Sequence, residues 1–371
     1  MAYEDRKKII LEIERLRAGR SLICFFNFDR HSEPQLPGLS TQFHADVKEA
    51  LFRVLKESKP MKGIDLCLYT RGGDTNSVWP IVSLIREFDR DFQVVAPFRC
   101  HSSGTLVALG AAKVLLGPIS ELSPIDPSTG NQFNPRDPSD PQKRMAISVE
   151  DVRAYKSFIC EQFLDPKTKK AVPFERLAET HLRPFVERLT TEVHPLALGN
   201  VQRVLMQIQQ LATNLLNLHP STNEDVSAVV EALTTRFYSH LHMINRDEAK
   251  DILGERVEFA SPDLASALDG LLRAHEDSFR LRHTFFLSSY LSGKQQAEVR
   301  FVGGAVESQA WSYLFETKAT IRQHVRLPPN VQIQIPSGQP MPLIPGLPRE
   351  TEVEITAQGW MHNIEPLGVT A

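Results

Sequence analysis

Residues 64–117 read IDLCLYTRGGDTNSVWPIVSLIREFDRDFQVVAPFRCHSSGTLVALGAAKVLLG. Three apolar runs of strand length in this stretch alternate with two segments whose apolar residues recur at helical spacing. Strands that are apolar on both sides, and that alternate with helices, are typical of a parallel sheet covered on both faces. The stretch therefore predicts an α/β unit with right-handed crossover connections.

The same alternation continues outward from this stretch. Before it, SLICFFNF (21–28) is a further apolar run, and after it six prolines between 118 and 141 predict a surface loop. The capping box of Ser221 and Glu224 predicts the start of a later helix. We expect strands at 21–28, 64–70, 92–97, 113–117 and 256–259, and helices at about 3–18, 43–58, 76–88, 103–112, 148–164, 173–190, 196–217, 222–242, 246–252 and 262–291.

The chain after residue 295 has a different character. The stretches VQIQI (331–335) and EVEIT (352–356) alternate apolar and polar residues, as half-exposed antiparallel strands do. We therefore expect three parts: an α/β domain over 1–260, a helical extension over 261–294 and a small β-rich appendage over 295–371.

Composition excludes several classes of protein. The 371 residues include 42 Lys+Arg and 45 Asp+Glu, a net charge of −3, and 42% are hydrophobic, so the chain is not disordered as a whole. Near-neutral charge gives no general attraction to nucleic acid or to anionic membranes. No run of about 18 apolar residues occurs, so we expect no membrane span. The charged amphipathic N-terminus and four cysteines without C-x-x-C spacing predict a cytoplasmic protein with reduced thiols.

Two features of the opening stretch suggest acyl-transfer chemistry. Gly72 and Gly73 follow a predicted strand, where glycines allow the backbone to present its N–H groups to a ligand. Ser102 precedes a predicted helix and so faces unpaired amides at the helix start. A nucleophile beside free amides is what acyl transfer requires. The alternative interpretation is a plain turn and a helix-capping serine.

Three motifs resemble the serine dehydrogenase proteinase family, a relative of signal peptide peptidase A and of the Clp protease subunit within the Clp/crotonase fold. They are LYTRGG (68–73), SSGT (102–105) and the stretch GPISELSPIDP (117–127). Segments 194–203 and 239–257 resemble further pieces of the same family. The resemblance covers about 1–290 and implies a parallel sheet spiral flanked by helices.

The resemblance also implies an activity. It makes Ser102 the nucleophile of a serine endopeptidase and makes the backbone N–H groups of Gly73 and Ser103 its oxyanion hole. Ser103 replaces the Ala that is usual in the family turn, so a second hydroxyl stands beside the first. Peptide or protein substrates, a homo-oligomer and the absence of a cofactor follow from the same resemblance.

A serine hydroxyl needs a proton acceptor, and the sequence leaves its identity open. His194 precedes a helix inside a family-like segment, and Asp126 could orient its imidazole in a Ser-His-Asp arrangement. Relatives of the signal-peptide-peptidase type use a lysine, for which Lys143 and Lys156 are the candidates. A lysine base must be desolvated, whereas the surroundings of Lys143 are charged.

Other functions remain open at this point. A crotonase-type acyl-CoA enzyme uses the same oxyanion geometry without the serine, and a non-catalytic scaffold keeps the fold without the base. His240 and His242 are two residues apart on a predicted helix and so face different sides, which argues against a metal site. The apolar stripe of 205–216 suits either the core of the chain or a subunit interface. Residues 295–371 are a candidate surface for a protein partner.

Overall fold

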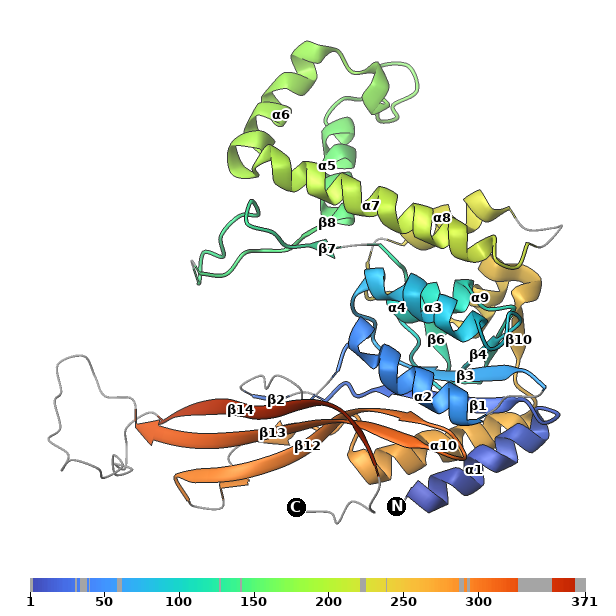
Figure 1. Ribbon diagram of the computed structural model, residues 1–371. Coiled ribbons are helices and arrows are strands. Elements are labelled where there is room, and N and C mark those ends of the chain that lie inside the picture. Colours follow the sequence, from blue (N-terminus) through green and yellow to red (C-terminus); the bar gives the residue numbers. More distant parts are fainter. Residues whose placement is uncertain are drawn as a thin grey trace, which may run out of the picture. The chain divides into compact units, whose positions relative to one another are not determined.

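The computed structural model describes residues 3–30, 32–33, 39, 41–58, 62–126, 128–140, 142–220, 225–237, 239–286, 290–291, 294–325 and 349–363. It divides into two compact units (Figure 1). Unit 1 comprises Met1–Glu121 and Arg256–Ala371, and unit 2 comprises Leu122–Glu255. The expected boundaries at 260 and 294 coincide with neither unit.

Unit 1 is built on one eight-stranded sheet with the order β10-β5-β4-β3-β1-β12-β13-β14. The first five strands in this order run parallel, and the last three continue the sheet antiparallel. The expected mixed α/β class with a large, mostly parallel central sheet is therefore confirmed. The strands are β1 Ser21–Asn27, β3 Ile64–Tyr69, β4 Gln93–Ala96, β5 Lys113–Leu116, β10 Val257–Phe259, β12 Gln296–Glu307, β13 Ser312–Val325 and β14 Arg349–His362.

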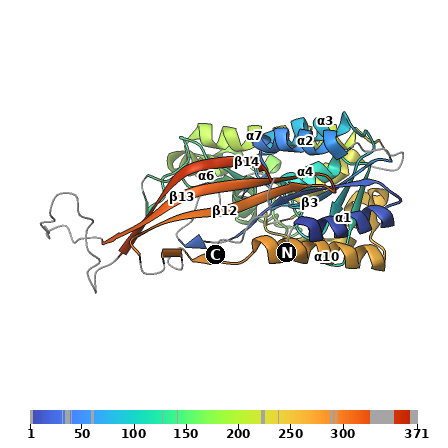
Figure 2. The ribbon, with the colours of Figure 1, turned by 60° about the horizontal axis from the view of Figure 1, so that its bottom comes forward.

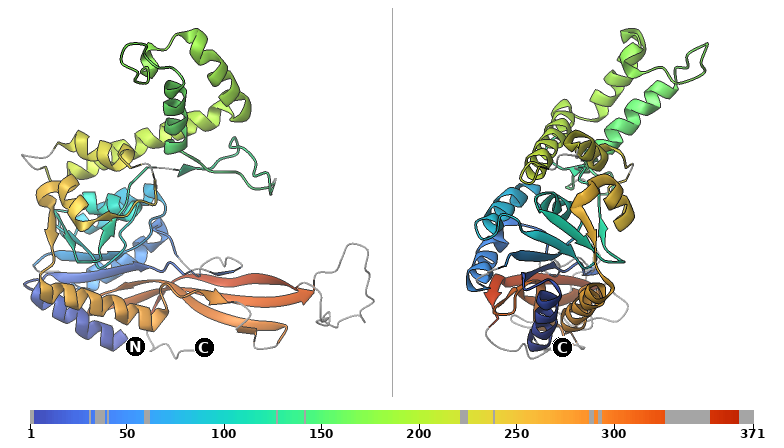
Figure 3. Two further views of the ribbon diagram at one scale, coloured as in Figure 1. Left: turned by 180° about the vertical axis from the view of Figure 1, so that it is seen from behind. Right: turned by 90° about the vertical axis from the view of Figure 1, so that its right-hand side faces the viewer.

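Helices cover both faces of the parallel part of this sheet, which explains why its strands are continuously apolar. Every residue of β1 and β3 is buried. Helices α1 (Tyr3–Leu16) and α10 (Pro262–Phe279) pack on one face, and α2 (Lys48–Ser58) and α3 (Val78–Arg86) lie on the other (Figures 2 and 3). The short helix α4 (Ser103–Leu109) is buried along its whole length. The strands β2 Ser32–Glu33 and β11 Phe285–Phe286 form a separate parallel pair.

The C-terminal strands belong to the central sheet and do not form a separate appendage. β12 pairs antiparallel with β1, placing Ala305 opposite Phe26. This pairing satisfies the edge of β1 that the parallel strands leave open. The predicted strand at 352–356 lies within β14, whereas the predicted strand at 331–335 lies outside the described residues.

A buried ion pair joins α1 to β12 within unit 1. The Arg6 guanidinium donates to both carboxylate oxygens of Glu307 at 2.8 and 2.6 Å, and both side chains are almost fully buried. Ser312 donates a further hydrogen bond to Glu307 at 2.7 Å. Although burial alone raises the pKa of Glu307, the Arg6 charge and hydrogen bonds hold that pKa well below its usual range.

Unit 2 is mainly helical. Its helices are α5 Val149–Glu161, α6 Glu179–Glu192, α7 Pro195–Leu216, α8 Val226–Thr235 and α9 Arg246–Leu253. The remaining short strands of the chain are β6 Glu121–Leu122, β7 Ser128–Thr129, β8 Ile147–Ser148 and β9 Ile244–Asn245. Across both units, the 3-10 helices are Ala45–Val47, Thr75–Ser77, Phe174–Arg176 and Gly254–Arg256. The α7 residues Leu205, Ile208, Leu215 and Leu216 are buried within the chain, so core packing accounts for the stripe at those positions.

Two helices are shorter than the sequence predicts. The helix expected at 222–242 ends at Thr235, and Asp225 caps its start by accepting from the Ala228 amide; Ser221 and Glu224 lie outside the described residues. The helix expected at 262–291 ends at Phe279 because Arg280 adopts a left-handed φ of 52°. Among the described helices, none is both long enough and apolar enough to cross a bilayer.

Candidate active site

Ser102 lies at the corner between the central sheet and α4. The backbone ladder that begins in β3 continues past its end, since the Thr70 amide donates to the Arg99 carbonyl and the His101 amide donates to the Thr70 carbonyl. The chain then turns sharply at Ser102, whose φ of 49° and ψ of −108° are rare for a residue with a side chain. Such a conformation costs about 1–3 kcal/mol and concentrates at functional sites.

Gly72 and Gly73 shape the opposite side of this corner. Both have positive φ, at 100° and 155°. A Cβ atom at position 72 would lie 2.7 Å from the Cβ of Ser102, and one at position 73 would lie 2.3 Å from the Phe43 carbonyl oxygen. No other residue type fits either position, so the two glycines bring the backbone close to Ser102.

Two backbone amides border the corner, one in the Gly-Gly turn and one at the start of α4. The Phe43 amide donates to the Gly72 carbonyl, and the Asp74 amide donates to the Phe43 carbonyl. The Gly73 N–H takes no part in this pairing. The Ser103 N–H is the first of the helix and has no carbonyl in a preceding turn. Within the described part of the chain, neither N–H has a hydrogen-bond acceptor. They are the two donors that the sequence predicts for an oxyanion hole.

The two neighbouring serines differ in their surroundings. Ser103 is fully buried, and its hydroxyl donates to the Gly73 carbonyl at 3.1 Å. Ser102 is partly exposed. The Ser103 hydroxyl thus holds the Gly73 peptide in place, and Ser102 is the more exposed of the two serines.

A charged cluster fixes the strand ends beside this corner. The Asp29 carboxylate, 7% exposed, accepts from the Tyr69 hydroxyl at 2.9 Å and from Arg71 Nε at 2.7 Å, and it also accepts from Arg99. Burial, with a further contribution from Asp29, raises the pKa of the Tyr69 phenol, so this group stays protonated. Because Arg71 precedes the Gly-Gly turn, its bond to Asp29 restricts where that turn lies.

The His101 ring is buried and lies beside a carboxylate. The residue is 8% exposed, and its Nε2 lies 3.2 Å from the Glu121 carboxylate. Burial raises the pKa of Glu121 despite the opposing charge of Arg99. The Cys100 amide also donates to the Glu121 carbonyl, so Glu121 is bonded to the segment that precedes Ser102.

Unit 2 contains an acid–imidazole pair that the sequence analysis missed. Asp126 is 3% exposed, and one of its carboxylate oxygens lies 3.0 Å from His240 Nδ1. The His240 side chain is 42% exposed, so the far side of its ring is accessible. The hydrogen bond to Asp126 raises the pKa of His240 against the opposing effect of burial. The pair joins residues 114 positions apart, a separation at which local periodicity carries no signal.

His194, the predicted base, lies elsewhere in unit 2. It caps α7, with its Nδ1 accepting from the Leu196 amide at 3.1 Å, and its ring stacks on Phe133 at 4.9 Å. Asp126 is hydrogen-bonded to His240. Within the described residues the structure therefore unites Asp126 with His240 and does not unite it with His194.

The two candidate lysines are solvated ion-pair partners. Lys156 is 50% exposed and lies 3.0 Å from Glu175, and Lys143 is 74% exposed beside Asp140. Neither is desolvated as a lysine base must be. His242 contacts Glu248 at 3.3 Å and is separate from the His240 pair, and the described residues contain no group of three side chains suited to a metal ion.

Comparisons with known proteins assign no activity. No protein-family model matches the chain. The uncharacterized protein MJ0137 of Methanocaldococcus jannaschii is 30% identical over 82 residues, which are 22% of this chain and 29% of the relative. The uncharacterized protein MJ1495 of the same organism is 26% identical over 136 residues, 35% of this chain and 45% of the relative. The chain spans less than half the length of either relative that it matches.

Proposed function

We propose that this protein is a serine peptidase of the Clp/crotonase type with Ser102 as its nucleophile. The observation that carries the proposal is the corner at Ser102: a partly exposed serine in a strained conformation beside two amides without acceptors. Stored backbone strain and free donors at one point are features of acyl-transfer sites. The motif resemblance at 68–73 and 102–127 supports the same fold and reaction.

The reaction begins with attack of Ser102 Oγ on the scissile carbonyl carbon, while the hydroxyl proton passes to a base. The carbonyl oxygen becomes an oxyanion that accepts hydrogen bonds from the Gly73 and Ser103 amides. Collapse of this intermediate breaks the C–N bond, and the leaving amine takes the proton from the base. Water then attacks the acyl-enzyme with the same base accepting its proton, which releases the acid and restores Ser102.

The proposed base is an imidazole, chosen on its own hydrogen bonding. His240 is favoured because Asp126 holds its Nδ1 and fixes the tautomer that presents a free Nε2. His194 is the alternative that the sequence predicts. Kinetics distinguish the two, since only loss of the true base removes proton transfer.

The proposal includes the compartment, the substrates and the assembly state of the protein. Cys24, Cys67 and Cys100 are buried and free, which supports a reducing compartment such as the cytoplasm. Peptide or protein substrates and a homo-oligomer follow from the family resemblance.

Hydrolysis of a fluorescein-labelled unfolded protein tests the proposal. Ser102→Ala is expected to reduce the rate to background, whereas Ser103→Ala is expected to retain part of the activity, because it keeps the backbone N–H and loses only the hydroxyl that holds Gly73. His240→Gln is expected to lower kcat by about 10²–10⁴-fold, the contribution of a general base, and His194→Gln is expected to leave it nearly unchanged. Full activity in the Ser102→Ala variant would refute the proposal. The reverse result for the two histidines would assign the base to His194.

A further inference from the structure

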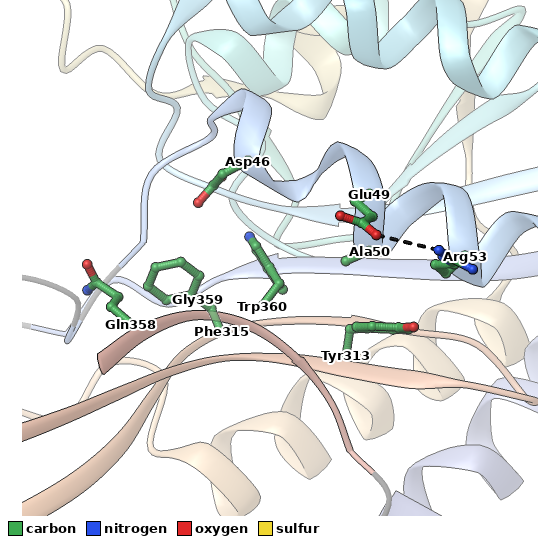
Figure 4. Close-up of a pocket in the computed structure, with 9 residues that line it drawn as sticks. All are labelled: Asp46, Glu49, Ala50, Arg53, Tyr313, Phe315, Gln358, Gly359 and Trp360. Atoms are coloured by element: carbon green, nitrogen blue, oxygen red, sulfur yellow. Dashed lines mark ion pairs between the residues drawn. The ribbon is translucent and has the colours of Figure 1, made fainter. Parts of the chain in front are cut away.

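A groove of about 440 Å³ lies in unit 1 between the α2 segment and the strands β13 and β14 (Figure 4). It shares no lining residue with the Ser102 corner. The helix side contributes Asp46, Glu49 and Arg53, and the sheet side contributes Phe315, Gln358 and Trp360. Aromatic rings and carboxylates thus meet in one concave surface.

Trp360 is positioned by the sheet beneath it. It lies directly opposite Phe315 in the register of β13 and β14, and the two rings meet edge to face at 5.4 Å. Its ring crosses the sheet over Gly304, where a Cβ atom would lie only 3.2 Å from the indole. Figure 4 shows Trp360 rising from β14 toward the helix segment that carries Asp46 and Glu49. Gln358, two residues earlier, faces the same side of the strand.

The indole nitrogen of Trp360 is a hydrogen-bond donor without an acceptor. It is buried, and no atom of the described residues accepts from it. A buried donor that is left unpaired is unfavourable. The groove therefore suits a ligand that brings an acceptor oxygen to Trp360.

The charges of the groove favour a cation. The lining contains two carboxylates, Asp46 and Glu49, and one guanidinium, that of Arg53, which lies 3.6 Å from Glu49. His44 Nδ1 lies 3.5 Å from the Asp46 carboxylate. Within the described part of the chain no cationic side chain lies over the Phe315 or Trp360 ring. Aromatic rings with nearby carboxylates are a suitable environment for a Lys or Arg side chain.

The adjacent strand can hold the main chain of the same ligand. Among the described strands, β14 pairs with β13 alone, so no described strand occupies its outer edge. An extended peptide can add to such an edge by main-chain hydrogen bonds. A residue placed opposite Gln358 would direct its side chain to the face of Trp360, toward Asp46 and Glu49.

We propose that this groove binds a Lys or Arg side chain of an extended peptide that pairs with the edge of β14. A peptide supplies both a cation for the carboxylates and a carbonyl oxygen for Trp360 Nε1, whereas a metal ion or a simple ammonium supplies only the charge. The site is independent of Ser102 chemistry, and its test measures binding and not hydrolysis.

Fluorescence anisotropy on the full Ser102→Ala chain tests the proposal, because this variant cannot consume the probe. The probes are fluorescein-labelled peptides in which Thr and Val flank a central Lys, norleucine or Glu. We expect the affinity to fall in that order. The double variant Asp46→Asn/Glu49→Gln should lower the affinity for the Lys peptide only about threefold to tenfold, since both carboxylates are exposed and screened by solvent. It should not change the affinity for the norleucine peptide.

Two further variants complete the test. Trp360→Phe keeps an aromatic ring but removes the N–H donor, so it should lower the affinity for the Lys and norleucine peptides by similar factors. Glu57→Gln, which removes an exposed charge from the same helix outside the groove, should change neither. Any of three results would overturn the proposal. They are equal affinity for the Lys and Glu peptides, no binding of any of the three peptides, and an unchanged affinity for the Lys peptide in the Asp46→Asn/Glu49→Gln variant.

Discussion

A Cβ atom placed on Gly72 would lie 2.7 Å from the Cβ of Ser102, closer than two such atoms approach in folded proteins. The backbone at position 72 also has a φ of 100°, which side chains disfavour. Gly72→Ala is therefore expected to displace Ser102 and to lower the hydrolytic rate by about a hundredfold, the effect of a misplacement of about 1 Å. Steady-state hydrolysis by the folded variant measures this effect, and a rate equal to that of the unaltered chain would contradict the close approach.

Gly199→Ala is the matched glycine substitution. Gly199 lies exposed inside α7, and a Cβ atom there would meet no atom within 4 Å. Alanine restricts the unfolded chain and favours the helix, so we expect a gain of about 0.5–1 kcal/mol in the free energy of unfolding, with unchanged hydrolysis. Urea denaturation measures the gain. A loss of stability would show that position 199 is more crowded than the structure indicates.

The Arg6–Glu307 pair predicts a large loss of stability when one partner is removed. Arg6→Met leaves the Glu307 carboxylate buried without its cation, so the free energy of unfolding should fall by about 3–5 kcal/mol. Since the native pKa of Glu307 is depressed, its contribution is present above the unfolded value of about 4.3 and is lost as the pH falls toward the native pKa. Lys8→Ala, which breaks an exposed pair with Asp5, is the control and should unfold close to the unaltered chain. Equal stability of the two variants would contradict the assignment.

The His240–Asp126 pair predicts a dependence on pH. Because the native pKa of His240 is raised, the charged pair stabilises unit 2 below about pH 6.5, and this contribution disappears as the pH rises through the native pKa. His240→Gln should therefore cost more stability at pH 6 than at pH 9. A titration of the histidine ring resonances should give His240 a pKa above the ordinary value, and Asp126→Asn should lower it. An identical titration curve in Asp126→Asn would show that the pair does not form.

The sequence predicts the local backbone structure around Ser102 well. The strand at 64–70, the Gly-Gly turn and the helix start near 103 all appear at the expected positions, because each rests on apolar runs and residues with strong conformational preferences. Ser103 is buried and its hydroxyl donates to the Gly73 carbonyl, while the choice of Ser102 as nucleophile stays a prediction.

Long-range pairings were not predictable from the sequence. The alternating pattern of the C-terminal segment indicates strands but not that β12 adds to the edge of β1, some 280 residues earlier. The Asp126–His240 pair likewise depends on where α8 ends. The sequence predicts a helix that includes His240, whereas α8 ends at Thr235 and His240 lies in the segment after it. The end of α10 is set by the left-handed conformation of a single residue, Arg280. The spacing of apolar residues carries no information about such a conformation.

The central claim is that the Ser102 hydroxyl is an activated nucleophile, and covalent labelling by a fluorophosphonate probe tests it most directly. Peptide mapping by mass spectrometry locates the adduct between the two adjacent serines. The account predicts one adduct on Ser102 in the unaltered chain and in Ser103→Ala, and none in Ser102→Ala. An adduct of equal yield in Ser102→Ala would contradict it.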